Sequence, residues 1–264
     1  MEGSYEVQQC SSDIFLTYRH HAKNIDAIAE GLNAERVNRY DLTFPFEIGE
    51  QHIVDGVAVI GVPVYAGRVP KDCLERMVNY KANEVPTILV ALYGNCEFED
   101  ALVELRNVSI VQGFKVIASG AFIGEHSYST PKRPIAAGRP NVDDLRLAVE
   151  FGQQIAEKIE HNDFSIPEID GNVPYKERVK FGGVAPETDA ETCTLCGRCA
   201  EVCPFRIVTV SNSVTIQAEN CIMCAACVKT CPVAARPFNH PMIEERREML
   251  IKNCSTPKSP KTFL

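Results

Sequence analysis

The sequence predicts an α/β fold, in which a doubly wound parallel sheet is followed by a small cysteine-rich domain. Three observations lead to this prediction. Three nearly continuous runs of Val, Ile and Leu suit strands that are buried on both faces of a parallel sheet. Helical patterns alternate with these runs, as is typical of doubly wound sheets. Eight of the twelve cysteines lie within residues 193–231, where this alternation has stopped.

The elements of the first part follow one another along residues 12–160, and about five strands are expected. Strands are predicted at 13–18, 36–42, 56–65, 87–94 and 114–124, and helices at 23–32, 71–80, 98–112 and 142–159. Asn141 is a suitable N-cap for the last helix, whose first turn contains Asp143 and Asp144. Ligands of such sheets bind beyond the carboxyl ends of the strands. The loops that follow the strands here are TYRHHA, PVYAGRVP, LYGNCEFED and GEHSYS.

The chain is expected to divide into five parts. A tail over residues 1–11 precedes the α/β domain at 12–160. Residues 161–186 are rich in Pro, Gly and charge and have no periodicity, which indicates a linker. The cysteine-rich domain follows at 187–240, and residues 241–264 form a C-terminal helix and tail.

The composition argues against several classes of protein. A net charge of −8 is unfavourable for binding nucleic acid, because nucleic-acid-binding proteins normally present a basic patch. The N-terminal residues lack the basic start and apolar stretch of a signal peptide, and no apolar run reaches the about 20 residues that cross a bilayer. A cytoplasmic location without a membrane partner is therefore expected. Thiols stay reduced there, so clustered cysteines are more often metal ligands than disulfides.

The strongest signal is an internal repeat of the cysteines. Residues 193–204 read CTLCGRCAEVCP and residues 221–232 read CIMCAACVKTCP, so every cysteine recurs 28 residues later. The pattern C-x2-C-x2-C-x3-C-P is the bacterial-type ferredoxin signature, in which the fourth cysteine of each run ligates the other [4Fe–4S] cluster. Two clusters are therefore expected. The first would be held by Cys193, Cys196, Cys199 and Cys231, and the second by Cys203, Cys221, Cys224 and Cys227.

Structural zinc is the alternative use of such thiols, although zinc sites usually have two separated C-x2-C pairs. The remaining cysteines, Cys10, Cys73, Cys96 and Cys254, share no ligand spacing. They are expected to be structural, because free cysteine commonly behaves as a small buried hydrophobic residue. Of these four, only Cys96 lies in a candidate site loop.

Taken as a whole, the chain resembles a family of flavodoxin–ferredoxin fusions from anaerobic microbes, the EFR-type family ferredoxins. The resemblance covers nearly the whole length and rests on GVPVYAGRVP, LYGNCEFEDAL, GAFIGEHSYS, PIAAGRP, GNVPYKER, VAPETD and the tail NCSTPKSPKTFL. It implies a flavodoxin-like domain followed by a double-cluster ferredoxin. It also implies electron transfer, with FMN as a candidate further cofactor.

The resemblance assigns candidate positions around a flavin ring, which in flavodoxins lies between two loop residues, often aromatic. The matching residues here are Tyr65 and Tyr93, while Gly67, Gly94 and Asn95 could bring backbone amides to the ring. The alternative for the two tyrosines is that they only cap the edge of the sheet.

The phosphate loop of the family usually reads Ser-x-Thr-Gly-x-Thr, and this chain departs from it. Only the first hydroxyl is kept, at Thr17. The glycine is lost, and the side chain of His20 would obstruct the approach of the backbone to a phosphate. Arg19, His20 and His21 offer positive charge instead. Weak or absent FMN binding is therefore expected.

Three functions remain open on this evidence. The first is a cytoplasmic electron carrier whose flavodoxin-like domain docks an unidentified redox protein. The second is an FMN-containing iron–sulfur oxidoreductase, and the third is a non-redox binding protein with structural clusters. No nucleophile–base pair or dinucleotide motif indicates a substrate reaction. Arg198, which stands between two ligands of the first cluster, predicts a higher reduction potential for that cluster.

Overall fold

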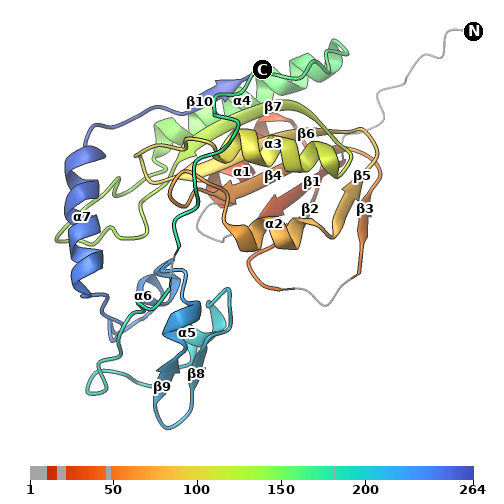
Figure 1. Cartoon of the computed structure of the whole chain (residues 1–264). Coiled ribbons are helices and arrows are strands. Elements are labelled where there is room, and N and C mark those ends of the chain that lie inside the picture. The colour runs from red at the N-terminus through yellow and green to blue at the C-terminus, as the bar shows by residue number, and fades with distance from the viewer. Residues whose placement is uncertain (1–10, 17–21, 46–48, 181) are drawn as a thin grey trace, which may run out of the picture.

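A parallel sheet forms the centre of the larger domain in the computed structural model, which describes residues 11–16, 22–45, 49–180 and 182–264. Within these residues the sheet has six strands, in the order β10-β7-β6-β4-β1-β2 (Figure 1). Five of them are parallel, namely β1 (Ser11–Leu16), β2 (Arg36–Asp41), β4 (Val57–Pro63), β6 (Val85–Tyr93) and β7 (Phe114–Ile123). The order reverses between β1 and β4, as in the flavodoxin-like doubly wound sheet. The predicted fold class is confirmed.

Helices cover both faces of this sheet because its central strands are apolar on both sides. Every residue of β4 is buried. The helices α1 (Ala22–Gly31) and α4 (Val142–Glu160) pack on one face, and α2 (Lys71–Met77) and α3 (Ala101–Val111) pack on the other. Gly31 and Gly152 lie where α1 meets α4, and a Cβ on Gly152 would come within 2.3 Å of the Ile28 carbonyl oxygen. The two helices therefore approach as closely as only glycine permits.

The predicted elements are found with small shifts at their ends. Asn141 caps α4 as expected: its side chain accepts from the backbone N–H of Asp144, and the Asp144 carboxylate accepts from the backbone N–H of Asn141. A separate pair of short parallel strands, β3 (Gln51–Ile53) and β5 (Tyr80–Ala82), was not predicted. The second of these begins where the prediction ended a helix.

The cysteine-rich part of the chain forms a small lobe below the α/β domain in Figure 1. It contains the short helices α5 (Arg198–Glu201) and α6 (Ala226–Lys229), the antiparallel hairpin of β8 (Val208–Val210) and β9 (Val214–Ile216), and the 3-10 turn η2 (Ala218–Asn220). The core of the lobe also includes Tyr128 and Ile135 from the loop after β7, and Ile243. The lobe is therefore packed against the larger domain through a shared apolar cluster.

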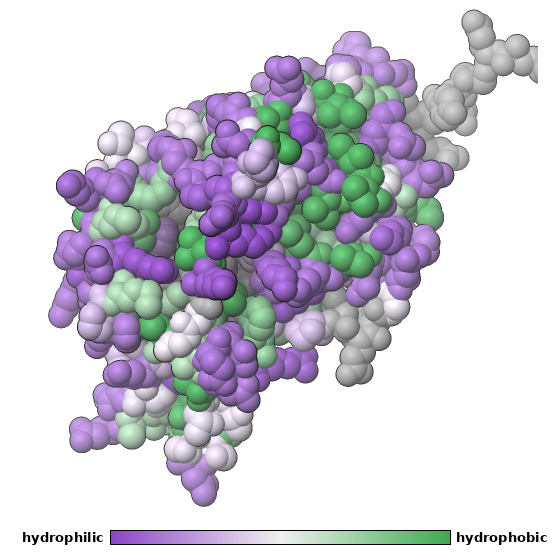
Figure 2. Space-filling view, viewed as in Figure 1, coloured by the Kyte–Doolittle hydropathy of each residue, from purple (hydrophilic) through white to green (hydrophobic). Residues whose placement is uncertain are grey.

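The C-terminal residues return to the α/β domain. Helix α7 (Pro241–Asn253) runs along one side of the molecule, and the last strand, β10 (Lys261–Phe263), pairs antiparallel with β7 (Figure 1). This strand covers the outer edge of β7, which would otherwise present unpaired backbone groups. None of the described helices combines the length and the apolar character needed to cross a bilayer. Figure 2 shows a mainly hydrophilic face on which apolar residues form small patches.

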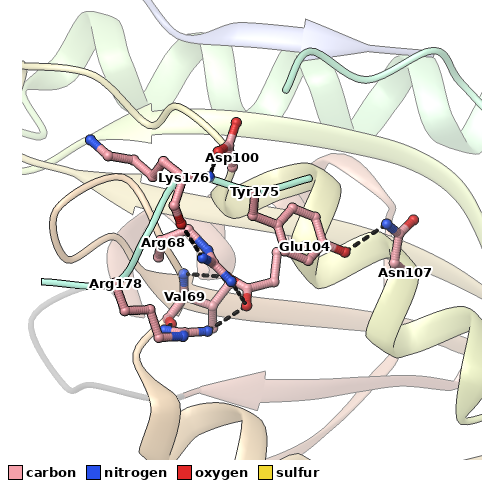
Figure 3. Close-up of polar contacts among 8 residues, drawn as sticks. All are labelled: Arg68, Val69, Asp100, Glu104, Asn107, Tyr175, Lys176 and Arg178. Carbon is pink, nitrogen blue, oxygen red and sulfur yellow. Dashed lines mark hydrogen bonds and ion pairs between the residues drawn. The ribbon is translucent and has the colours of Figure 1, made fainter. Parts of the chain in front are cut away.

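The predicted linker is fastened to the α/β domain at residues 172–178 (Figure 3). The buried carboxylate of Asp100 accepts from the backbone N–H groups of Asn172 and Lys176, at 2.8 and 2.7 Å. Burial acts to raise the pKa of Asp100, but these hydrogen bonds outweigh it and the pKa is lowered. Arg68 lies 4.7 Å from the centre of the Tyr175 ring and pairs with Glu104. The connection between the domains is thus held in a fixed path.

Two of the scattered cysteines require a correction. Cys96 and Cys254 form a disulfide, whereas both were expected to be separate buried thiols. Cys254 directly follows α7, so the bond joins the C-terminal end of this helix to the loop after β6. Cys73 is outside the disulfide and fully buried, as expected, and Cys10 lies outside the described residues.

Candidate iron–sulfur and cofactor site

The two runs of cysteines adopt the same backbone conformation. Three pairs of positions, each 28 residues apart, share positive φ angles: Leu195 and Met223, Gly197 and Ala225, and Arg206 and Ala234. Five of these six residues are not glycine. A positive φ is uncommon in residues other than glycine, and it costs free energy that the surrounding structure has to supply. The repeat in the sequence is therefore also a repeat in structure. Each cysteine run contains a short helix, α5 in the first run and α6 in the second.

Each of the two predicted ligand sets lines its own small cavity. One cavity is lined by Cys193, Cys196, Cys199 and Cys231. The other is lined by Cys203, Cys221, Cys224 and Cys227. The fourth cysteine of each run thus faces the cavity of the other run, as in the bacterial-type ferredoxin signature. Across the described residues, no three His, Cys, Asp or Glu side chains converge on a site for a single metal ion.

The environment of the thiols suits a cluster that carries positive iron. Burial raises the pKa of the Cys224 thiol to about 12, and burial also raises the pKa of Cys221 and Cys227. Cluster ligands bind as thiolates, so these groups need a nearby cation, which iron supplies. Cys196 differs because it is exposed, and the backbone N–H of Arg198 lowers its pKa. The donor sets fit one [4Fe–4S] cluster in each cavity.

A larger cavity of about 690 Å³ lies where the two domains meet. The end of β6 and the loops after β4, β6 and β7 form one wall, which includes Tyr65, Tyr93 and His126. The facing wall is formed by the second cysteine run and by α7, with residues Ile222, Met223, Cys224, Ala226, Lys229, Arg246, Met249 and Leu250. This volume is in the range of cofactor and ligand sites, and the lining is mostly apolar with a few polar groups, as is usual for them.

Only one of the two cysteine sites adjoins this larger cavity. Ile222, Cys224 and Ala226 line both the larger cavity and the cavity of the second ligand set. The residues around the first ligand set and those around the larger cavity have no member in common. The second site therefore shares a wall with the space between the domains.

Three of the predicted flavin-contacting residues line the larger cavity. They are Tyr65, Tyr93 and Gly94. Tyr93 is only 5% exposed and packs edge-on against Phe98, and burial raises its pKa to about 12, so it stays a neutral phenol. Tyr65 is half-buried. The apolar walls between these rings and the second cysteine run fit a flat aromatic group such as a flavin ring.

The other predicted flavin-contacting residues have different surroundings. The Gly67 carbonyl accepts from the backbone N–H of Asp100, and a Cβ on Gly67 would collide with the Glu99 side chain. The Asn95 side chain holds the C-terminal tail, donating to the carbonyls of Cys254 and Thr256 and accepting from the Lys258 N–H. Neither residue is among those that line the cavity. That their backbone amides contact a flavin stays a prediction.

The predicted phosphate loop cannot be placed. Its candidate residues lie outside the described residues: Thr17, Arg19, His20 and His21. Lys23, which follows this loop at the start of α1, lines the larger cavity.

His126 is a cavity residue that the sequence did not single out, although its loop, GEHSYS, was predicted to follow a strand at the ligand-binding edge. Its Nδ1 accepts from the backbone N–H of Tyr128 at 3.0 Å. A ring nitrogen that accepts carries no proton, so the neutral ring has its proton on Nε2. Burial, helped by the positive charge of Lys229, lowers the pKa of His126 to about 4. The cavity is thus lined by a histidine that remains neutral at physiological pH.

This shift predicts that mild acid destabilises the protein. In the unfolded chain His126 binds a proton as the pH falls through about 6.5, whereas in the folded chain it does so only near pH 4. Between these two values the unfolded state binds more protons, so the free energy of unfolding falls as the pH falls. Asparagine offers an acceptor in place of Nδ1 and does not titrate. His126→Asn should therefore show a smaller loss of stability between about pH 7 and about pH 5 in urea denaturation. Equal slopes for wild type and His126→Asn would contradict the prediction.

Comparison with known proteins gives one family match. The 4Fe–4S dicluster domain family matches residues 185–232. No curated protein matches the chain. Three similar solved structures are an archaeal flavodoxin (13% identity, 57% of this chain and 98% of that chain, TM-score 0.36), the Fusobacterium nucleatum flavodoxin bound to flavin mononucleotide (12%, 59% and 99%, 0.37) and a flavodiiron core from Synechocystis (12%, 59% and 37%, 0.41).

The strand order gives the fold of the first domain, and the family match gives the class of the second. The chain therefore joins an α/β domain with the flavodoxin-like strand order to a segment, residues 185–232, that matches the 4Fe–4S dicluster domain family.

Proposed function

We propose that this protein is a cytoplasmic electron carrier with two [4Fe–4S] clusters, whose flavodoxin-like domain binds FMN weakly or not at all. The observation that carries the proposal is the pair of cavities, each lined by four thiols of the doubled repeat. When bound, the clusters would supply one-electron transfer. The protein residues hold the two sites within one small lobe and fix that lobe against the α/β domain.

The two sites face different surroundings, which supports a role between two redox partners. The first site lies near the surface: Cys196 is exposed, and Leu195 and Val233 beside it are each 42% exposed. Exposed apolar side chains around a redox site offer a surface to a docking protein. The second site shares its wall with the larger cavity instead. We therefore propose that the first site exchanges electrons with an external redox protein, and that the second site exchanges them with the molecule that occupies the larger cavity.

The larger cavity favours a second candidate function, an FMN-containing iron–sulfur oxidoreductase. Tyr65 and Tyr93 would hold the flavin ring on the sheet side, and Met223 and Met249 would exclude water on the other. The neutral imidazole of His126 would offer a hydrogen-bond donor at Nε2. The altered phosphate loop weighs against tight binding, because the backbone would not reach the phosphate closely.

One experiment decides between the two functions. Anaerobically purified protein should contain about eight irons and about eight sulfides per chain, and it should lose any FMN on desalting. Replacing residues 17–22 by a Ser-x-Thr-Gly-x-Thr loop should strengthen FMN binding, measured by the quenching of flavin fluorescence. Zinc without sulfide would refute the clusters. About one tightly held FMN per wild-type chain would favour the oxidoreductase and make Arg19, His20 and His21 the phosphate ligands to test.

A further inference from the structure

Arg76, at the end of α2, is a mostly buried cation that reaches from the α/β domain to the iron–sulfur lobe. Its side chain is only 10% exposed and forms an ion pair with Asp72, one turn earlier in the helix, at 3.3 Å. Its Nη1 donates to the carbonyls of Leu42 and Thr43, in the loop after β2, at 2.9 and 2.6 Å. Its Nη2 donates to the Pro204 carbonyl of the lobe at 2.9 Å. One guanidinium group therefore joins the two domains.

The lobe side of this contact belongs to the second cysteine site. Pro204 directly follows Cys203, the ligand that the first run contributes to the second set, and Phe205 comes next. All three residues line the cavity of the second ligand set. The guanidinium carbon of Arg76 also lies 5.7 Å from the centre of the Phe205 ring, within the range of a cation–π contact. Arg76 thus contacts both residues that follow the ligand.

The internal repeat supplies a comparison, because the equivalent residues 28 positions later are Cys231, Pro232 and Val233. Both loops close with the same turn, in which the cysteine carbonyl accepts from the N–H three residues later, at 3.0 and 3.3 Å. In the described part of the chain, however, no side chain donates to the Pro232 carbonyl, and valine offers no ring to a cation. Of two loops with the same turn, only the one at the second site is bound by an arginine of the α/β domain.

We propose that Arg76 is a positioning residue of the second iron–sulfur site, which acts through Pro204 and Phe205 to hold Cys203 in place as a ligand. This inference rests on the proposed function, because it requires the clusters. The other three ligands of the second set come from one short loop, whereas Cys203 comes from the other run. The second site also shares a wall with the larger cavity. Arg76 therefore fixes this cluster relative to the domain that forms the opposite wall of that cavity.

The ion pair with Asp72 makes this effect one of position more than of charge. The Asp72 side chain is only 7% exposed, so its carboxylate offsets the charge of Arg76 at a place that salt screens weakly. Lysine would keep the positive charge and a partner for Asp72. It has one nitrogen, however, in place of the two that donate to separate loops in Arg76. Arg76→Lys therefore removes the hold on Cys203 and leaves the charge.

Iron release to the chelator ferrozine under anaerobic conditions tests the proposal on full-length, cluster-loaded protein. Loss of one hydrogen bond from a charged group should make opening of the second site about tenfold more frequent. In Arg76→Lys, about half of the iron should therefore leave about tenfold faster than in wild type, and the rest at the wild-type rate. The matched control is Arg68→Lys, at an equally buried arginine whose bonds do not reach the lobe. It should not separate the two halves. Equal acceleration of both halves in Arg76→Lys, or no acceleration, would overturn the inference.

A second measurement identifies the ligand that moves. Protein labelled with 13C at cysteine Cβ is compared by paramagnetic nuclear magnetic resonance, in which each ligand signal depends on the orientation of its thiolate toward iron. The Cys203 signals should move in Arg76→Lys. They should move less in Phe205→Val, an exposed position that thereby receives the residue of its repeat and does not threaten folding. The Cys231 signals should stay in place in both variants. Unmoved Cys203 signals, or equal movement of Cys203 and Cys231, would overturn the inference. Wild-type protein without iron and sulfide would refute the proposed function itself, which distinguishes the two failures.

Discussion

Replacing Glu104 by alanine should lower the free energy of unfolding by about 3–5 kcal/mol, because it leaves a buried arginine without its counter-charge. The Glu104 carboxylate accepts from Nε and Nη2 of Arg68 at 2.9 and 2.6 Å, and from the Val69 backbone N–H at 3.1 Å (Figure 3). Its side chain is only 4% exposed, and that of Arg68 is 10% exposed. It also pairs with Arg178 of the connecting segment. A single substitution therefore breaks one of the contacts that hold this segment to α3, beside those of Asp100.

Urea denaturation followed by far-ultraviolet circular dichroism measures this loss. The matched control is Glu75→Ala, which breaks the exposed pair with Lys71 and should change stability by less than about 0.5 kcal/mol. Limited trypsin digestion gives an independent readout, because release of residues 172–178 would expose the bonds after Lys176 and Arg178. A loss below about 1 kcal/mol for Glu104→Ala would show that the pair is not the anchor that its burial indicates.

The sheet could be predicted from the sequence because its signals are local. The strands β4, β6 and β7 are apolar runs, and the helices that alternate with the strands carry their own periodicity and, at Asn141, their own cap. The cysteine repeat is equally local, since four ligands of each cavity lie within one or two short loops. These features depend on residues close together in the chain, and the structure shows them where they were expected.

What the sequence missed depends on contacts between distant segments. The disulfide joins residues 158 apart, and neither Cys96 nor Cys254 has a spacing that reveals its partner. Strand β10 has three residues and is a strand because the edge of β7 is available to pair with it. Part of the facing wall of the larger cavity comes from α7, for which no motif indicates a ligand site. Tertiary packing, and not local preference, decides all three.

The predicted effect of Arg198 on the potential of the first cluster stays a prediction. Proximity along the chain suggests electrostatic influence, but the influence depends on burial and on direction in space. Arg198 is exposed, so solvent and salt weaken its field. A sequence lists the charges, and only the fold gives the dielectric surroundings of each.

Replacing Cys199 by serine should have the largest effect on cofactor content and stability, because it removes a cluster ligand and, with the cluster, the stabilisation that cluster binding gives to the lobe. The thiol is buried at the second residue of α5 and lines the first cavity with Cys193, Cys196 and Cys231. Iron content should fall from about eight to about four per chain or lower. The lobe should also lose stability, because so small a domain cannot build an adequate core without its metal, and metal binding contributes directly to folding. Iron and sulfide analysis with visible absorbance measures the first effect, and proteolysis of the lobe measures the second.

The matched control is Cys73→Ala, which removes a buried thiol from α2 of the other domain. It should leave iron, sulfide and the visible spectrum unchanged, even though loss of a buried side chain destabilises the α/β domain somewhat. The comparison separates the loss of a ligand from the loss of a packed sulfur. If Cys199→Ser protein kept its full iron content and its resistance to proteolysis, Cys199 would not be a ligand. The first ligand set would then have to be assigned to other residues.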